Sequence, residues 1–112
     1  MQGIKNYING ELIAPVQGNY IDNYEPATGQ VYGQIPNSDS ADIELAYSAA
    51  KKAFPSWSKT TLTERSAILG KIANTITQKL DFLAKAEARD NGNPLSLAKA
   101  IDIPRAAANF QY

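Results

Sequence analysis

The spacing of apolar residues changes once along this 112-residue chain, and that change limits what the chain can fold into. In the first third, faces alternate at every second residue: Tyr20, Asp22 and Tyr24 alternate with Ile21 and Asn23. A two-residue period is typical of a β-ribbon with two different faces. After the first third, apolar residues recur every three or four positions, the period of an amphipathic helix. The sequence therefore predicts an α+β arrangement with a β-hairpin region over 1–37 and a helical region over 38–112.

Turn residues divide the first region into two hairpins. Asn9-Gly10 lies between the short runs 6–8 and 11–13, and Asn-Gly is a strong hairpin signal because both turn residues must accept a positive φ. A second pair of strands is predicted over 19–24 and 30–35. The residues between them include a Pro that fixes φ and a Gly that accepts a positive φ.

The helical region should hold four to five helices. Asp39 is the predicted N-cap of the first, with Asp42 in its first turn, and Pro55 is predicted to end it. Its apolar stripe is Ile43, Ala46, Tyr47, Ala50 and Phe54. Trp57 is expected in the connection that follows.

The remaining helices have start and stop signals of their own. Thr61 and Glu64 have the spacing of a capping box. The predicted buried face of that helix is Leu62, Ile68, Leu69, Ile72 and Ile76. A third helix is expected over 81–89, stopped by Asn91-Gly92, and a fourth after Pro94. Asp102 is a candidate cap for a last helix that has Pro104 in its first turn.

Composition narrows the possible functions. Eleven basic and eleven acidic side chains cancel, so the chain has no electrostatic signature of nucleic-acid or anionic-membrane binding. No run of 18 apolar residues is present, and the first five residues lack the features of a secretory signal. We therefore expect a cytoplasmic protein that binds neither nucleic acid nor membrane.

The absence of cysteine and histidine restricts the chemistry further. A thiol nucleophile, an imidazole base and a Cys/His metal site are all excluded. No glycines have the Gly-x-Gly-x-x-Gly or Walker spacing. We therefore predict no nucleotide-binding loop in this chain, and any reaction that it ran alone would need carboxylates, Lys, Ser or Tyr.

Two charged features remain as candidates. Glu87 and Asp90 are three residues apart and would share a helix face, which permits an acid–base pair but is more typical of a solvated helix end. Arg105 follows Pro104 among apolar residues; it could bind a carboxylate bidentately or extend its guanidinium from an apolar stripe into water.

The last residues continue a helical pattern. The run from Ala106 to Tyr112 continues to the last residue of the chain, and two of its last three residues are aromatic, whereas a helix usually closes with a Gly or Asn followed by a polar tail. We expect from this that the chain is part of a longer polypeptide.

Six segments of the chain carry a recognisable pattern. They are Tyr7-Ile8-Asn9-Gly10-Glu11, Tyr24-Glu25-Pro26-Ala27-Thr28-Gly29-Gln30-Val31, Ala53-Phe54-Pro55-Ser56-Trp57, Thr63-Glu64-Arg65, Asp90-Asn91-Gly92-Asn93-Pro94 and Asn109-Phe110-Gln111-Tyr112. In this order and at this spacing, the segments resemble the aldehyde dehydrogenase superfamily. The resemblance covers nearly the whole chain, although Glu25 stands where the family usually has Asn, and Asn93 where it has Lys. Within the family, 20–24 and Asp102-Ile103-Pro104-Arg105 look like the 2-aminomuconic and 2-hydroxymuconic semialdehyde dehydrogenases.

The resemblance implies a fold, an activity and a few sites. Residues 1–112 would be the N-terminal segment of the cofactor-binding domain, the front part of the α/β fold of an oxidoreductase that uses NAD or NADP. Arg105 would hold a substrate carboxylate. Backbone carbonyls of Asn23 and Tyr24, with Asp90, would contribute to a structural Na⁺ or K⁺ site in the intact enzyme, although Asp90 could equally close a helix end.

We accordingly expect an N-terminal fragment of an NAD(P)⁺-dependent aldehyde dehydrogenase. Its partners would be the remainder of that polypeptide, a small-molecule aldehyde, and further copies in a homodimer or homotetramer. The catalytic Cys, the general-base Glu and the cofactor strands come later in the family, so the fragment alone should be inactive and bind no cofactor or ion. The alternative is a stand-alone, non-catalytic protein-interaction domain derived from this fold; a small hydrolase has no motif in its favour.

Overall fold

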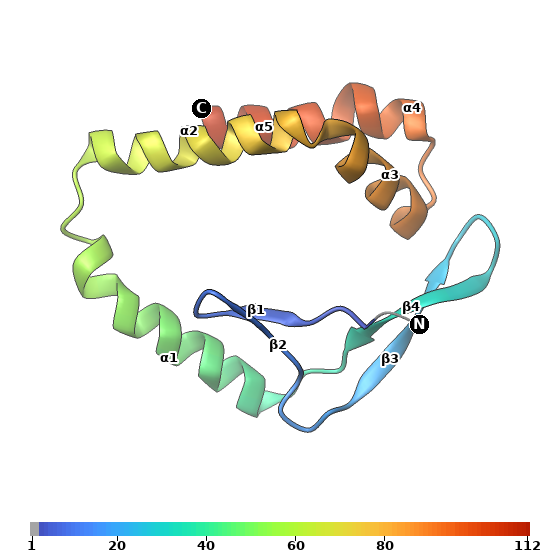
Figure 1. The fold of residues 1–112 in the computed structure, drawn as a ribbon, viewed down its shortest axis with the longest axis horizontal. Helices are drawn as coiled ribbons and strands as arrows, with labels where there is room; N and C mark the ends of the chain where they lie inside the picture. The colour runs from blue at the N-terminus through green and yellow to red at the C-terminus, as the bar shows by residue number, and fades with distance from the viewer. Residues whose placement is uncertain (1–2) are drawn as a thin grey trace. The chain divides into compact units, whose positions relative to one another are not determined.

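A computed structural model describes residues 3–112, which form two compact units. Unit 1 comprises the residues up to Tyr24 together with Gly29–Lys59, and unit 2 comprises Glu25–Thr28 and Thr60–Tyr112. Met1 and Gln2, which entered the prediction that no secretory signal is present, lie outside the described residues. Figure 1 labels the elements of both units.

Unit 1 begins with the predicted first hairpin. Strands β1 (Asn6–Ile8) and β2 (Glu11–Ile13) pair antiparallel, with Asn6 opposite Ile13. Asn9 and Gly10 have φ values of 55° and 79°, so both turn residues adopt the left-handed conformation that this turn requires. The hairpin prediction is confirmed to the residue.

The second predicted hairpin is also present. Strands β3 (Tyr20–Glu25) and β4 (Gln30–Pro36) form a separate two-stranded sheet. The start of the chain adds a short parallel contact to β4, in which the Ile4 amide donates to the Gln34 carbonyl at 2.8 Å.

Helix α1 (Ser40–Trp57) completes unit 1. Asp39 caps it as predicted, and the Asp42 side chain returns the contact to the Asp39 backbone. The prediction that Pro55 ends the helix is wrong, because α1 continues through Pro55 to Trp57. Pro55 has no amide to donate to the carbonyl four residues back, so α1 loses one hydrogen bond there, and only two helical residues follow it. Trp57 is therefore the last helical residue and not part of the connection.

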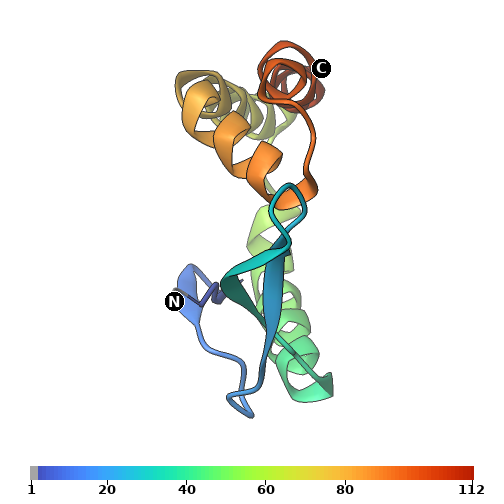
Figure 2. The ribbon, with the colours of Figure 1, turned by 90° about the vertical axis from the view of Figure 1, so that its right-hand side faces the viewer.

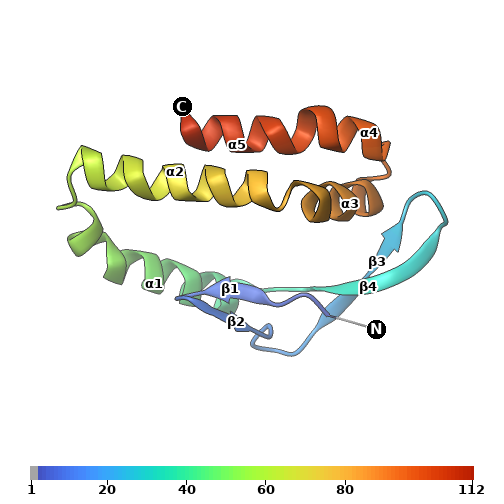
Figure 3. The ribbon, with the colours of Figure 1, turned by 45° about the horizontal axis from the view of Figure 1, so that its top comes forward.

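Unit 2 is helical apart from the Glu25–Thr28 turn. It contains α2 (Leu62–Gln78), α3 (Leu80–Asn91), and a third helical run made of α4 (Leu95–Leu97), the π-helical turn η1 (Ala98–Asp102) and α5 (Ile103–Gln111). Figure 3 shows α5 beside α2 and running in the opposite direction, and Figure 2 shows the two nearly end-on. The predicted class, hairpins followed by helices, is confirmed.

Asp102 does not cap the last helix as predicted. It has helical φ and ψ, its side chain makes no capping bond, and the helical run passes through it from η1 into α5. The Ile103 amide donates to the Ala98 carbonyl, five residues back. A wider turn thus precedes Pro104, and helical backbone is maintained up to a residue that has no amide donor.

The buried apolar side chains of unit 2 are all small. Ala73, Ala84, Ala98 and Ala107 are buried, whereas Leu62 is 83% exposed and Ile72 is 38% exposed. The predicted buried face of α2 is therefore wrong for residues 3–112. The residue that α2 buries is Ala73, which was not in the predicted face, and the large apolar side chains of that face remain accessible. Helical spacing identified an apolar face but not what covers it.

Candidate functional site

Arg105, the predicted substrate-binding residue, lies in the first turn of α5 and is exposed. No ion pair to its guanidinium is present among residues 3–112. Pro104 and the wider turn η1 precede it, so its backbone is held by a rigid local feature. An exposed cation on a rigid helix start can bind a carboxylate without first breaking an internal pair.

Asp102 is the functional candidate that sequence reasoning missed at this helix start. Its Oδ2 atom is buried and accepts no hydrogen bond from the part of the chain that the structure describes. An unpaired buried acceptor is uncommon in folded proteins. Two sequence signals involve Asp102: its place before Pro104, which predicts a cap, and its membership of the 102–105 segment that resembles the semialdehyde dehydrogenases.

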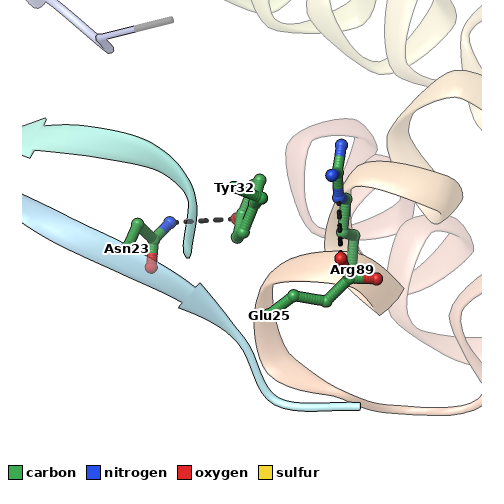
Figure 4. Close-up of polar contacts among 4 residues, drawn as sticks. All are labelled: Asn23, Glu25, Tyr32 and Arg89. Carbon is green, nitrogen blue, oxygen red and sulfur yellow. Dashed lines mark hydrogen bonds and ion pairs between the residues drawn. The ribbon is translucent and has the colours of Figure 1, made fainter. Parts of the chain in front are cut away.

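The two predicted carbonyl ligands are adjacent on β3 in unit 1. Asn23 donates from Nδ2 to the Tyr32 hydroxyl on β4 at 2.9 Å, as Figure 4 shows. Tyr24 is 57% exposed. The Asn23 side chain therefore binds across the hairpin to β4, and the predicted ligand atom is its backbone carbonyl oxygen on β3.

The third predicted ligand, Asp90, lies in unit 2. It occupies the last turn of α3, which ends at Gly92 with a φ of 79°. Glu87, the other member of the suggested acid–base pair, accepts a hydrogen bond from Asn91 Nδ2 at 2.6 Å. This contact is typical of a helix end, and it favours that interpretation of Glu87 over a catalytic one. Within residues 3–112, no three His, Cys, Asp or Glu side chains are grouped so that they could hold a metal ion.

A contact beside Asp90 was not predicted from the sequence. Arg89 Nε lies 3.2 Å from Glu25 Oε2 (Figure 4), and Pro26 lies against Gly92. The two charged residues are 64 positions apart, so no local pattern could have paired them.

The carboxylates with clearly shifted pKa values lie at helix starts. The Asp39 amide, and after it the Val16 amide at 2.8 Å, donate to Asp42 and lower the pKa of its carboxyl. The Thr61 amide donates to Glu64 at 2.7 Å and lowers the pKa of that carboxyl. Hydrogen bonds to the charged form explain both shifts, so these groups have structural roles.

An open groove runs along α2 and the start of α3 in unit 2. Its volume is about 420 Å³, and it is lined by Ile68, Lys71, Ile72, Thr75, Ile76, Lys79 and Leu83. The lining is mainly aliphatic, which suits a packing surface and offers no set of groups for catalysis. None of the described helices is both long and apolar enough to cross a bilayer.

Comparison with known proteins identifies the family. The family model for the aldehyde dehydrogenase family matches residues 13–112. The chain belongs to the aldehyde dehydrogenase family. The match begins at the end of β2 and includes β3, β4 and all the helices, so the resemblance seen in the sequence is confirmed.

Individual aldehyde dehydrogenases match nearly the whole chain. The 2-aminomuconic semialdehyde dehydrogenase of Mus musculus is 43% identical over 109 residues, 97% of this chain and 22% of that protein. The fluoroacetaldehyde dehydrogenase of Streptantibioticus cattleyicolor is 47% identical over 107 residues, 96% of this chain and 21% of that protein. The crystal structure of PnpE in complex with nicotinamide adenine dinucleotide superimposes with a TM-score of 0.95 at 37% identity, covering 97% of this chain and 22% of that one. This aldehyde dehydrogenase chain thus spans about a fifth of the length of the curated relatives it matches.

Proposed function

We propose that this chain is the N-terminal segment of the cofactor-binding domain of an NAD(P)⁺-dependent aldehyde dehydrogenase. One observation supports it most directly: the large apolar side chains are exposed, while the buried apolar ones are alanines. A surface of this kind is expected where further protein packs. The family match and the NAD complex of a structural relative support the activity of the intact enzyme.

The segment does not supply the chemistry. The family reaction needs a thiolate that attacks the aldehyde and a cofactor that takes the hydride, and this chain has no cysteine. Its residues also do not fit the cofactor, because no glycine-rich phosphate loop is present. The contribution of the segment is therefore a scaffold, one wall of the substrate entrance, and part of a cation site.

For the substrate, we propose an aldehyde that carries a carboxylate. Arg105 is exposed, rigidly placed and without an ion pair among the described residues. The similarity to 2-aminomuconic semialdehyde dehydrogenase fits a carboxylated semialdehyde. The similarity to fluoroacetaldehyde dehydrogenase fits a neutral one, so Arg105 itself has to be tested.

The test is Arg105→Ala in the full-length enzyme. Loss of a bidentate carboxylate contact is worth about 2–4 kcal/mol, so kcat/KM for carboxylated semialdehydes should fall about 30- to 900-fold. Neutral aldehydes should be nearly unaffected. Lys85→Ala, an exposed cation on α3, is the control and should leave both substrate classes unchanged. An equal loss on both classes would remove the substrate assignment.

For the cation, we propose Na⁺ or K⁺ held in the intact enzyme by the carbonyls of Asn23 and Tyr24 and by Asp90. Oxygen ligands suit such hard cations. Asp90→Ala in the full-length enzyme should abolish the dependence of thermal stability on K⁺ or Na⁺. Unchanged dependence would exclude Asp90 as a ligand.

The intact enzyme is proposed to be a cytoplasmic homodimer or homotetramer. The alternative function is a stand-alone interaction domain, which the exposed groove on α2 favours. An activity assay on the isolated chain does not distinguish the enzyme segment from the interaction domain, because both proposals expect the chain to show no NAD⁺-dependent aldehyde oxidation. The length of the natural polypeptide does distinguish them. Activity in the pure 112-residue chain would contradict both.

A further inference from the structure

The turn between β3 and β4 is attached to the helices of unit 2. Glu25–Thr28, which includes the last residue of β3 and leads to β4, belongs to the same compact unit as Thr60–Tyr112. Two neighbouring contacts produce this attachment. One is the ion pair between Glu25 and Arg89, and the other is the packing of Pro26 on Gly92 (Figure 4 shows the ion pair).

The packing contact leaves little room for a side chain at position 92. A Cβ added to Gly92 would lie 3.0 Å from the Pro26 Cβ and 3.5 Å from its Cγ. Gly92 also has a φ of 79°, which disfavours other residues. Gly10, Gly18 and Gly29 share a positive φ, yet an added Cβ there would meet nothing within 4 Å. Gly92 alone among these four therefore combines the left-handed backbone with close packing.

The ion pair lies at the end of α3 where a cation is favoured. Arg89 is in the last turn of α3, next to the negative end of the helix dipole. The Arg89 side chain is 55% exposed and that of Glu25 is 25% exposed. A pair this exposed is weak and sensitive to salt, so it can adjust the contact without being the whole of it.

We propose that Glu25, Pro26, Arg89 and Gly92 form a clasp, by which the 25–28 turn and the α3–α4 corner at 91–94 open and close as one cooperative unit. Glu25 and Arg89 are its positioning residues, and because their ion pair weakens as salt is added, ionic strength adjusts how often the clasp opens. Asp90 lies inside the clasped segment, so the clasp also fixes the backbone that carries it. The clasp does not depend on the cation or substrate proposals.

Amide hydrogen exchange in the purified protein tests the clasp by following one amide in the 25–28 turn and one at the α3–α4 corner. The Thr28 amide donates to the Glu25 carbonyl, and the Gly92 amide donates to the Ala88 carbonyl. Arg89→Gln should raise exchange at Thr28 about threefold, and Glu25→Gln should raise exchange at Gly92 by a similar factor. The double variant should show no further increase. Raising NaCl from about 0.05 M to about 0.5 M should accelerate both amides in the parent and not in the double variant.

Matched glycine variants separate packing from backbone strain. Gly92→Ala and Gly18→Ala both place a Cβ at a positive φ, but only the first meets Pro26. Gly92→Ala should raise exchange at Thr28 at least tenfold, and Gly18→Ala should leave Thr28 unchanged. If Gly92→Ala does not fold, exchange in the Arg89→Gln and Glu25→Gln variants is sufficient to test the clasp. An Arg89→Gln protein in which Gly92 exchanges faster but Thr28 does not would overturn the clasp.

Discussion

The two units of this aldehyde dehydrogenase chain bury different kinds of residue. In unit 2 the buried residues are Ala73, Ala84, Ala98 and Ala107, so the helices meet through small side chains. In the described part of unit 1 the buried residues are Pro15, Gly33 and Asp42, and the Asp42 carboxylate accepts hydrogen bonds from the Val16 and Asp39 amides. Neither unit buries its large apolar residues: Phe54 on α1 is 65% exposed, and Leu62 on α2 is 83% exposed.

In both units, the residues buried within the unit are different from the large apolar residues exposed on its surface. Small side chains let helix backbones approach closely and tolerate little change in volume. Hydrogen-bonded carboxylates stabilise helix starts through donors rather than through buried area. The large apolar side chains remain available for surfaces beyond residues 3–112, as expected for a segment of a larger enzyme.

The largest effect should come from enlarging a buried alanine in unit 2. Ala98 is fully buried, so Ala98→Leu should lower the free energy of unfolding by about 2–3 kcal/mol through overpacking. Ala50→Leu, on the exposed face of α1, is the control and should change it by less than about 0.5 kcal/mol. Denaturant titration measures both. Equal effects would mean that the alanine contacts do not form the core of unit 2.

A smaller effect is expected at the start of α2. Thr61 Oγ1 accepts the Glu64 amide at 3.1 Å, so Thr61→Ala should cost about 1 kcal/mol of unfolding free energy. Thr63→Ala, two residues further along the exposed first turn, should be nearly neutral. A neutral Thr61→Ala would show that the cap contributes no stability to unit 2.

The features that the sequence predicted correctly depend on a few consecutive residues. Asn9-Gly10 required a left-handed turn and has one, and Thr61 with Glu64 forms the predicted capping box. The features that it predicted wrongly depend on distant contacts or on context. Pro55 was expected to end α1, and Asp102 to cap α5, because each residue usually acts so in isolation.

The same distinction between local pattern and distant contact applies to the candidate site residues. Arg105 could be proposed because the family motif names it, but its exposure and lack of an ion pair among residues 3–112 appear only in the structure. Glu25 and Arg89 are distant in sequence and meet only through the fold. The roles of Asn23, Tyr24 and Asp90 in cation binding stay predictions.

A pH titration should distinguish the two helix caps by unit. The pKa values of Asp42 and Glu64 lie below the ordinary values of 3.8 and 4.5 in the folded chain. Each carboxylate therefore stabilises the fold above its ordinary pKa, and that contribution is lost as pH falls through the folded pKa. As pH falls through the ordinary value of 3.8 and below it, the stability advantage of the parent over Asp42→Asn should shrink progressively.

Exchange at individual amides locates this loss. Asp42→Asn should weaken protection at the Val16 amide in unit 1, because Val16 donates to Asp42. Amides of α2 should keep their acid sensitivity in that variant, since Glu64 is unchanged. A pH-independent difference between the parent and Asp42→Asn would show that the charge of Asp42 is not what stabilises this end of α1.

The smallest effect is expected for an exposed apolar side chain. Because Leu62 is 83% exposed, Leu62→Ser should change the unfolding free energy of the 112-residue chain by less than about 0.5 kcal/mol. In a full-length enzyme, where we propose that this surface is covered, the same substitution should cost about 1–2 kcal/mol. Equal small effects in both would leave Leu62 outside any covered surface.

The most direct test of the segment proposal is the mass and activity of the natural species that carries this sequence. We predict a polypeptide several times heavier than 12.1 kDa, with NAD(P)⁺-dependent aldehyde oxidation. A natural, folded and monodisperse 12.1 kDa protein, whether active or inactive, would contradict it.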